Sequence, residues 1–343
     1  MEKRRFGSTE LRLSLIGMGG IPFMTISAGE VERVILKGLD CGVNFIETAR
    51  GYGSSEEKIG AALKGRRDDV LIITKGHMRR RDSAVNPLDD SLKALAVDYV
   101  DVYQIHGLRT GLLSKAEEAG LLEDLVKEGK KGKFRFLGIT THHPEAIYEA
   151  LEYDIFSSIQ APINFVEFDR YEAAMKEAAK KDFGILAMKP LGGGVFPAKE
   201  SLRFLKFTPV SAIPVGVQTP GEIEEDVLAV AGDEPLSAGE KERLERELAF
   251  WGERFCRKCG YCRGCPEGIP TSTLMLAEII YYRNGIEEML RMKYPEILKL
   301  SEKCTECGEC VKKCPYGLKI PRTIREYREK FLPILEKELS LRE

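Results

Sequence analysis

The sequence has no long apolar run and no excess of charge of one sign, and these absences narrow the classes of protein it can form. Its apolar stretches, such as 15–23, fall far short of the roughly 20 residues that span a bilayer. The 52 basic and 54 acidic side chains nearly cancel, so no single-sign surface for nucleic acid or an anionic membrane is expected. Residues 1–14 are charged and polar, without the apolar segment of an export signal. We therefore expect a cytoplasmic protein with no membrane and no nucleic-acid partner.

Most of the chain, from residue 13 to about 216, alternates short apolar runs with amphipathic helical patterns. The runs predicted as strands are 13–18, 43–47, 70–75, 99–106, 134–140, 154–160, 183–189 and 210–216. Eight strands that alternate with helices indicate a parallel sheet, and eight is the number that closes into a barrel. An open doubly wound sheet is the alternative, but no GxGxxG turn follows the first strand. The predicted fold class is α/β, a (β/α)8 TIM barrel.

The character of the sequence changes after residue 216, where no convincing strand follows. A last barrel helix over 219–231 leads through the polar segment 232–236 into a highly charged helix at 237–251. We predict a barrel domain over 1–235 and a helical domain over 236–343. The second domain holds eight of the nine cysteines. In a cytoplasmic chain such a cluster indicates metal ligation rather than disulfides.

The clustered cysteines form two motifs, each closed by a proline. The first has the spacing C-x2-C-x2-C-x2-C-P, and the second has the C-x2-C-x2-C-x3-C-P run of bacterial ferredoxins. The predicted metal ligands are Cys256, Cys259, Cys262 and Cys265 in the first motif, and Cys304, Cys307, Cys310 and Cys314 in the second. Two zinc sites are the alternative. A zinc site, however, does not require a third cysteine after a C-x2-C pair, or a proline after the fourth cysteine. The motifs therefore predict two [4Fe-4S] clusters in an α-helical ferredoxin-like domain.

The pairing of these cysteines follows from a rule for two-cluster ferredoxins, in which the fourth cysteine of each motif binds the other cluster. By that rule Cys314 joins the first three cysteines of the first motif, and Cys265 joins those of the second. The first motif is one residue shorter than the ferredoxin run, which leaves this pairing open.

Four polar side chains lie at, or five residues after, the ends of three neighbouring strands. They are Glu47, Tyr52, Lys75 and His106. Each alone has a structural explanation, such as an ion pair or core packing, but their joint position at the catalytic face of a barrel favours function. A lysine beside a phenol favours the phenolate, which lowers the tyrosine pKa and eases proton transfer. Together with a histidine that orients a substrate oxygen, this set could reduce a carbonyl.

The segments NFIETARGYGSSE, TKG and DYVDVYQIH, which carry these residues, resemble the aldo-keto reductase family. The resemblance extends over about residues 1–232 and implies a barrel that uses NADP or NAD. It further implies that Tyr52 is the general acid, that Lys75 tunes it, and that His106 orients the substrate. Glu47 stands where the family has aspartate, and the added methylene would disturb the contact with Lys75.

The same resemblance implies which residues hold the nicotinamide cofactor. They are Thr140, Thr141, Gln160, Met188, Gly192, Gly193, Gly194 and Gly216. The turn over 217–226 lacks the basic residues that usually hold a 2′-phosphate, and Glu222 would repel that group. NADH is therefore an alternative to NADPH.

The sequence as a whole predicts an NAD(P)-dependent oxidoreductase for a small carbonyl or alcohol substrate, accompanied by iron–sulfur electron transfer and a ferredoxin-like redox partner. The alternative is an electron-transfer or subunit protein, in which Glu47 impairs the barrel and the clusters carry the function. In a third reading the clusters are purely structural. A nicotinamide transfers two electrons and a cluster one, and the sequence shows no flavin motif that would link them.

Overall fold

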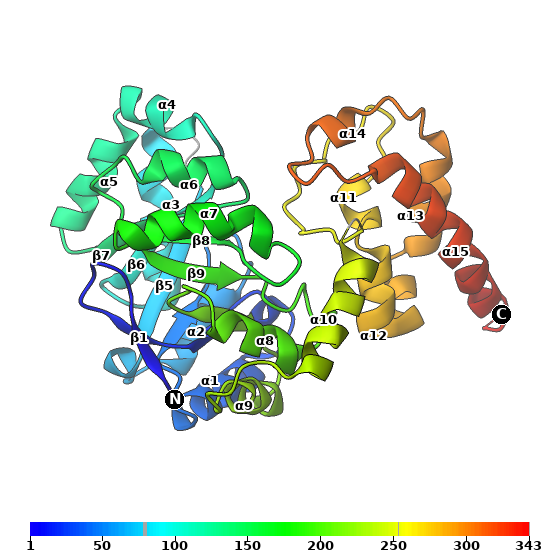
Figure 1. The fold of residues 1–343 in the computed structure, drawn as a ribbon. Helices are drawn as coiled ribbons and strands as arrows, with labels where there is room; N and C mark the ends of the chain where they lie inside the picture. Colours follow the sequence, from blue (N-terminus) through cyan, green and yellow to red (C-terminus); the bar gives the residue numbers. More distant parts are fainter. Residues whose placement is uncertain (78–80, 253, 343) are drawn as a thin grey trace. The chain divides into compact units, whose positions relative to one another are not determined.

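The computed structural model describes residues 1–77, 81–252 and 254–342. Their contacts divide the chain into two compact units (Figure 1). The first comprises Met1–Leu191 and Pro197–Glu245, and the second comprises Gly192–Phe196 and Arg246–Glu343. A short loop within the barrel sequence thus belongs to the second unit. The predicted domain boundary after residue 235 stays a prediction.

The first unit is built on eight parallel strands, paired in the order β10-β3-β4-β5-β6-β7-β8-β9. The strands are β3 (Ile16–Gly19), β4 (Phe45–Glu47), β5 (Leu71–Gly76), β6 (Val100–Leu108), β7 (Phe134–Thr141), β8 (Ser158–Pro162), β9 (Gly184–Met188) and β10 (Ile213–Gly216). An isolated parallel bridge joins Leu186 of β9 to Ala212, the residue directly before β10, and so links the two ends of the strand order. The prediction of a (β/α)8 barrel is confirmed.

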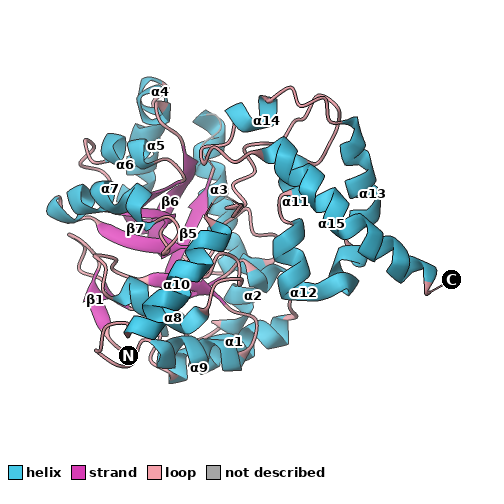
Figure 2. Ribbon diagram, turned by 45° about the vertical axis from the view of Figure 1, so that its right-hand side comes forward, coloured by secondary structure: helices cyan, strands magenta, loops and turns pink. Residues whose placement is uncertain are grey.

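Helices connect the strands and lie outside them (Figure 2). They are α1 (Ala28–Asp40), α2 (Ser55–Ala62), α3 (Arg81–Leu95), α4 (Leu112–Glu118), α5 (Leu121–Lys130), α6 (Pro144–Ala150), α7 (Phe168–Lys180), α8 (Ala198–Lys206) and α9 (Pro220–Ala229), followed by α10 (Ala238–Trp251). Local sequence sets their starts: Ser27 and Glu30 form a capping box at α1, and Thr219 caps α9.

The predicted first strand, 13–18, is two strands in the structure. Its first part belongs to β2 (Arg12–Ser14), which pairs antiparallel with β1 (Lys3–Arg5), whereas β3 enters the barrel. Ser14 fixes the break because its backbone N–H donates to Asn44 Oδ1 at 2.7 Å and its hydroxyl donates to the Ile16 carbonyl at 2.6 Å. The run 13–18 contains only this one polar side chain, and its sequence does not reveal a break set by a residue 30 positions away.

The described residues of the second unit form helices joined by loops and include no strand. Beyond α10 it contains α11 (Thr271–Leu274), α12 (Ala277–Arg291), α13 (Tyr294–Leu300), α14 (Glu309–Lys312) and α15 (Ile320–Ser340). Its core includes the buried side chains of Leu274, Met289, Tyr294, Leu298 and Phe331. Within the described part of the chain, no helix combines the length and the apolar character needed to cross a bilayer. The helical second domain that the sequence predicted is confirmed.

Candidate active site and cysteine cavities

The carboxyl ends of three adjacent strands bring the four predicted catalytic side chains together. Glu47 ends β4, Lys75 lies one residue before the end of β5, and His106 lies near the end of β6. Tyr52 follows β4 in a tight turn, in which its N–H donates to the Ala49 carbonyl at 2.9 Å. Parallel pairing of the strands therefore places residues far apart in sequence at one end of the barrel.

A buried ion pair forms the base of this group. Lys75, which is 1% exposed, pairs with Glu47 and also donates to the Thr48 carbonyl at 2.7 Å. Gln160 adds a second hydrogen bond, from its Nε2 to Glu47 Oε1 at 2.7 Å. Burial lowers the pKa of Lys75, and the charge of Glu47 opposes this effect. The glutamate therefore keeps the lysine contact that its added methylene was expected to disturb.

The Tyr52 ring lies close to both Lys75 and His106. Lys75 Nζ is 4.9 Å from the centre of the ring, and the Tyr52 and His106 ring centres are 6.0 Å apart with nearly perpendicular planes. Burial, followed by the charge of Glu47, raises the pKa of Tyr52 well above its ordinary value. The expected lowering is not found, because burial and, to a smaller extent, the charge of Glu47 both raise this pKa. The phenol therefore holds its proton, as a proton donor must.

His106 is a neutral imidazole in this environment. Burial, together with the positive charge of Lys75, lowers the pKa of His106 to about 2. The ring stacks on His77, with ring centres 4.3 Å apart and an angle of 8° between the planes. Among the described residues, His106 Nδ1 has no hydrogen-bond partner. A neutral ring held in this way can hydrogen-bond a ligand oxygen without adding charge.

The predicted cofactor residues on β7 and β8 are buried, and their side chains form hydrogen bonds within the protein. The Thr140 hydroxyl oxygen accepts from the Gly107 N–H at 2.8 Å, and the Thr141 hydroxyl donates to the Leu108 carbonyl at 2.8 Å. Gln160 gives its amide N–H to Glu47, but its buried Oε1 has no partner in the described part of the chain. This oxygen is the free acceptor that a carboxamide N–H would need.

The remaining predicted cofactor residues are divided between the two units. Met188 and Gly216 are the last residues of β9 and β10, in the first unit. Gly192, Gly193 and Gly194 follow β9 in sequence but belong to the second unit.

Sequence reasoning missed a second polar pair that follows two barrel strands. Lys189 comes directly after β9 and His142 directly after β7, and Lys189 Nζ is 3.2 Å from His142 Nε2. Lys189 has a φ of +57°, a conformation that non-glycine residues seldom adopt. A strand-end search that included the runs THH and MKP would have found both residues.

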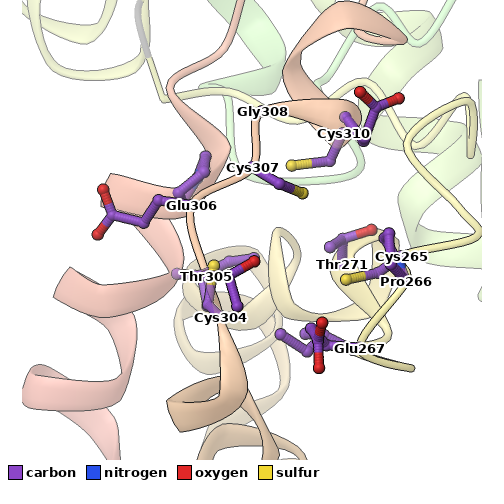
Figure 3. A pocket seen from close by; sticks show the side chains of 14 residues that line it. Cys265, Pro266, Glu267, Thr271, Cys304, Thr305, Glu306, Cys307, Gly308 and Cys310 are labelled. Carbon is purple, nitrogen blue, oxygen red and sulfur yellow. The ribbon is translucent and has the colours of Figure 1, made fainter.

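Four cysteines from the two motifs surround one cavity in the second unit. Cys304, Cys307 and Cys310 lie on one side and Cys265 faces them, with all four sulfur atoms directed into the common space (Figure 3). This cavity combines three cysteines of the second motif with the last cysteine of the first.

A second cavity has the complementary set. It is lined by Cys256, Cys259, Cys262 and Cys314. This grouping is the one that the ferredoxin rule predicts, although the ligand sets themselves stay a prediction. All the cysteines are free thiols, and four soft sulfur ligands around one space fit an iron–sulfur cluster. Among the described residues, no three ligand-type side chains stand close enough to hold a single metal ion.

Comparisons with known proteins agree with both halves of this description. The Aldo/keto reductase family matches residues 15–212, and the 4Fe-4S dicluster domain matches residues 255–318. An L-galactose dehydrogenase from Arabidopsis thaliana is 23% identical over 301 residues, which cover 72% of this chain and 93% of the relative. An NADH-specific methylglyoxal reductase from Escherichia coli (strain K12) is 30% identical over 202 residues, covering 49% and 60%.

A solved structure shows the same fold. The aldo-keto reductase AKR11C1 from Bacillus halodurans, in its holo form, superposes with a TM-score of 0.63 at 22% identity, covering 72% of this chain and 96% of that one. From its barrel fold and its family match, the chain belongs to the aldo/keto reductase family, with a 4Fe-4S dicluster domain following the barrel.

Proposed function

We propose that the protein reduces aldehydes or ketones with NADH or NADPH, or catalyses the reverse oxidation, and that Tyr52 is its general acid. The observation that carries this proposal is the contact of the protonated Tyr52 ring with the buried Lys75–Glu47 pair and with neutral His106. The family match supports an oxidoreductase of this type.

Each side chain has a distinct task in the proposed mechanism. When bound, the reduced nicotinamide supplies a hydride to the carbonyl carbon. Tyr52 donates its phenolic proton to the oxygen that gains charge, and positively charged Lys75 stabilises the phenolate that remains. Glu47 keeps Lys75 protonated and oriented, and His106 hydrogen-bonds the carbonyl oxygen. General acid catalysis of this kind accelerates a reaction by about 10²–10⁴-fold.

We infer that NADH is the preferred cofactor, held by the residues that the family resemblance identifies. The turn over 217–226 contains no lysine or arginine. Glu222 is fixed in that turn because its carboxylate accepts from the Gln218 N–H at 2.6 Å. A 2′-phosphate in this turn would meet negative charge without a cation to balance it. The name of the NADH-specific relative supports the same choice.

The two cysteine cavities support two [4Fe-4S] clusters, each held by three cysteines of one motif and one of the other. We propose that these clusters exchange single electrons with a ferredoxin-like redox partner. The alternative is a barrel without catalytic activity, and its main support was the expectation that Glu47 would not contact Lys75. Because Glu47 does pair with Lys75, that support is removed.

The test uses anaerobically purified protein with its clusters loaded. Titrations with NADH and NADPH give the two dissociation constants, and NADH oxidation is then followed with small aldehydes, including methylglyoxal. We expect Tyr52→Phe to lower turnover at least 100-fold and to leave NADH affinity within about twofold, because only the proton donor is removed. Tyr148→Phe, at an exposed tyrosine on α6, is the matched control and should behave like the wild type. Full turnover in Tyr52→Phe would exclude Tyr52 as the acid.

A further inference from the structure

The Cys256 cavity and the Cys304 cavity of the second unit, each named after one of its cysteines, differ in the charges that line them. Among the described residues around the Cys256 cavity are three cations and no carboxylate, and the cations are Arg257, Lys258 and Arg263. Among those around the Cys304 cavity are three carboxylates and no cation, and the carboxylates are Glu267, Glu306 and Glu309. Figure 3 shows two of these glutamates beside the cysteines of the Cys304 cavity. The two sets of sulfur atoms therefore lie in opposite electrostatic surroundings.

Ion pairs neutralise most of the negative charge at the Cys304 cavity. Glu306 pairs with Arg325, and Glu309 pairs with Lys312 at 2.7 Å. The side chain of Glu267 is exposed, so water and salt screen its charge. The electrostatic difference between the cavities therefore comes mainly from the cations of the Cys256 cavity.

Arg257 is the cation of the Cys256 cavity that water screens least. It is 5% exposed, whereas Lys258 and Arg263 are both exposed. Its guanidinium donates to the Phe255 carbonyl and lies 4.5 Å from the centre of the Tyr316 ring, which lines the same cavity. A charge in such a dry site acts on its neighbours through a lower effective dielectric constant, and so more strongly.

The charge of Arg257 acts on two cysteines of the same cavity. Burial lowers the pKa of Arg257 to about 10, and the charges of Tyr316, Cys314 and Cys259 oppose that effect. Cys259 and Cys314 are two of the four proposed cluster ligands in this cavity. Reduction adds one negative charge to a cluster, and a positive charge beside its ligands favours the reduced state.

Burial of the cysteines acts in the opposite direction but differs less between the cavities. Cys256 and Cys262 are buried, whereas Cys307 in the other cavity is exposed. Burial on its own disfavours the added negative charge of a reduced cluster. All the other motif cysteines are at least partly buried, so this difference is one of degree. The difference in lining charge is a set of whole cations, one of them buried, and it therefore outweighs the difference in exposure.

We propose that Arg257, with Lys258 and Arg263, raises the reduction potential of the cluster in the Cys256 cavity above that of the cluster in the Cys304 cavity. This inference rests on the proposed presence of both clusters, but not on carbonyl reduction in the barrel. The proposed redox partner delivers a single electron at the Cys304 cavity, where Cys307 is exposed. The electron then passes to the Cys256 cavity: the donor cluster loses one electron, the acceptor cluster gains it, and no bond forms or breaks.

The test is a redox titration of the full chain, purified anaerobically with both clusters loaded and followed by electron paramagnetic resonance. We expect two one-electron couples in the wild type. In Arg257→Gln the reduction equilibrium of the higher couple should fall about tenfold or more, which is about 59 mV for one electron, because a buried charge is lost. Arg257→Lys retains the charge, so its shift should be less than about threefold. Arg291→Gln, at an exposed arginine of α12 that pairs with Glu288, is the matched control and should leave both couples unchanged.

Two more variants assign the higher couple to its cavity and guard against misfolding. Cys265→Ser removes a cysteine of the Cys304 cavity, so it should leave only the higher couple, and adding Arg257→Gln should still lower that couple. If Arg257→Gln does not retain its iron, Arg263→Gln replaces it, at an exposed residue of the same cavity. Because water screens this charge, the higher couple should then fall by about threefold.

Iron analysis separates a failure of this inference from a failure of the proposed function. About eight iron atoms per chain with a single couple, or with two couples that Arg257→Gln leaves in place, would keep the proposed clusters and overturn the inference. A shift of the lower couple instead of the higher one would overturn it as well. Zinc, or about four iron atoms per wild-type chain, would contradict the proposed clusters and the inference together.

Discussion

Replacing Glu47 tests the electrostatic core of the proposed mechanism. Glu47→Gln keeps the shape and the length of the side chain but removes its charge, so Lys75 is left almost fully buried without a carboxylate partner. Breaking one side of a buried ion pair typically costs about 3–5 kcal/mol. The lysine can reduce that cost by giving up its proton, since burial already lowers its pKa and Glu47 is the main opposing influence.

The expected size of this effect follows from buried lysines in general, whose pKa values fall by up to 3–5 units. Without Glu47 the lowering of the Lys75 pKa by burial would lose its main opposing influence, so a larger fraction of the lysine would be uncharged as the pH rises. Uncharged Lys75 cannot stabilise the phenolate of Tyr52, and losing one such electrostatic partner costs about 10²–10³-fold in turnover.

The assay is the pH dependence of turnover between pH 6 and pH 8 for the wild type, Glu47→Gln and Glu47→Asp. Glu47→Gln should be strongly impaired at pH 8 and recover as the pH falls, because Lys75 regains its proton. Glu47→Asp retains the charge, so its pH profile should follow that of the wild type even if its turnover is lower. A Glu47→Gln enzyme with wild-type turnover and no recovery at low pH would refute this account of the ion pair.

Two further predictions concern the clusters and a buried acid. The protein should contain about eight iron atoms and eight acid-labile sulfide ions per chain. Cys314→Ser should lose about half of the iron and of the sulfide, whereas the control Cys41→Ser should keep both. Stoichiometric zinc without visible absorbance would contradict this prediction. Burial raises the pKa of Asp226 to about 7, so its protonated form stabilises the fold at low pH and that stabilisation is lost as the pH rises through 7. Asp226→Asn should therefore melt several degrees above the wild type at pH 8, with the difference shrinking toward pH 5; an equal shift at both pH values would argue against titration of Asp226.

The features that sequence predicted well are those with local signals. The eight barrel strands are short apolar runs between helical patterns, and all eight lie at or near their predicted positions. Tyr52, Lys75 and His106 could be singled out because polar residues at the ends of consecutive strands must lie near one another in a parallel barrel.

The features that sequence did not predict depend on residues far apart in the chain. The bond between Gln160 and Glu47 spans 113 positions and crosses from β8 to β4, so family resemblance alone assigned Gln160 to the cofactor. The pairing of His142 with Lys189 likewise joins residues 47 positions apart. The pKa of Tyr52 differs in direction from the expectation because burial, which sequence does not show, outweighs the effect of the neighbouring lysine.

The loop Gly192–Phe196 bears on whether the barrel sequence can fold without the residues that follow it. Phe196 is almost fully buried, and its ring packs against Phe255 and Trp251, which follow it in sequence by more than fifty residues. A fragment ending at residue 235 would lose both aromatic partners and expose this ring, although it would retain every barrel strand. The barrel sequence therefore does not form a self-contained unit, because the loop after β9 packs against residues that follow the barrel. If oxidation removes iron from the cysteines next to Phe255, we expect the packing of this loop to be disturbed as well.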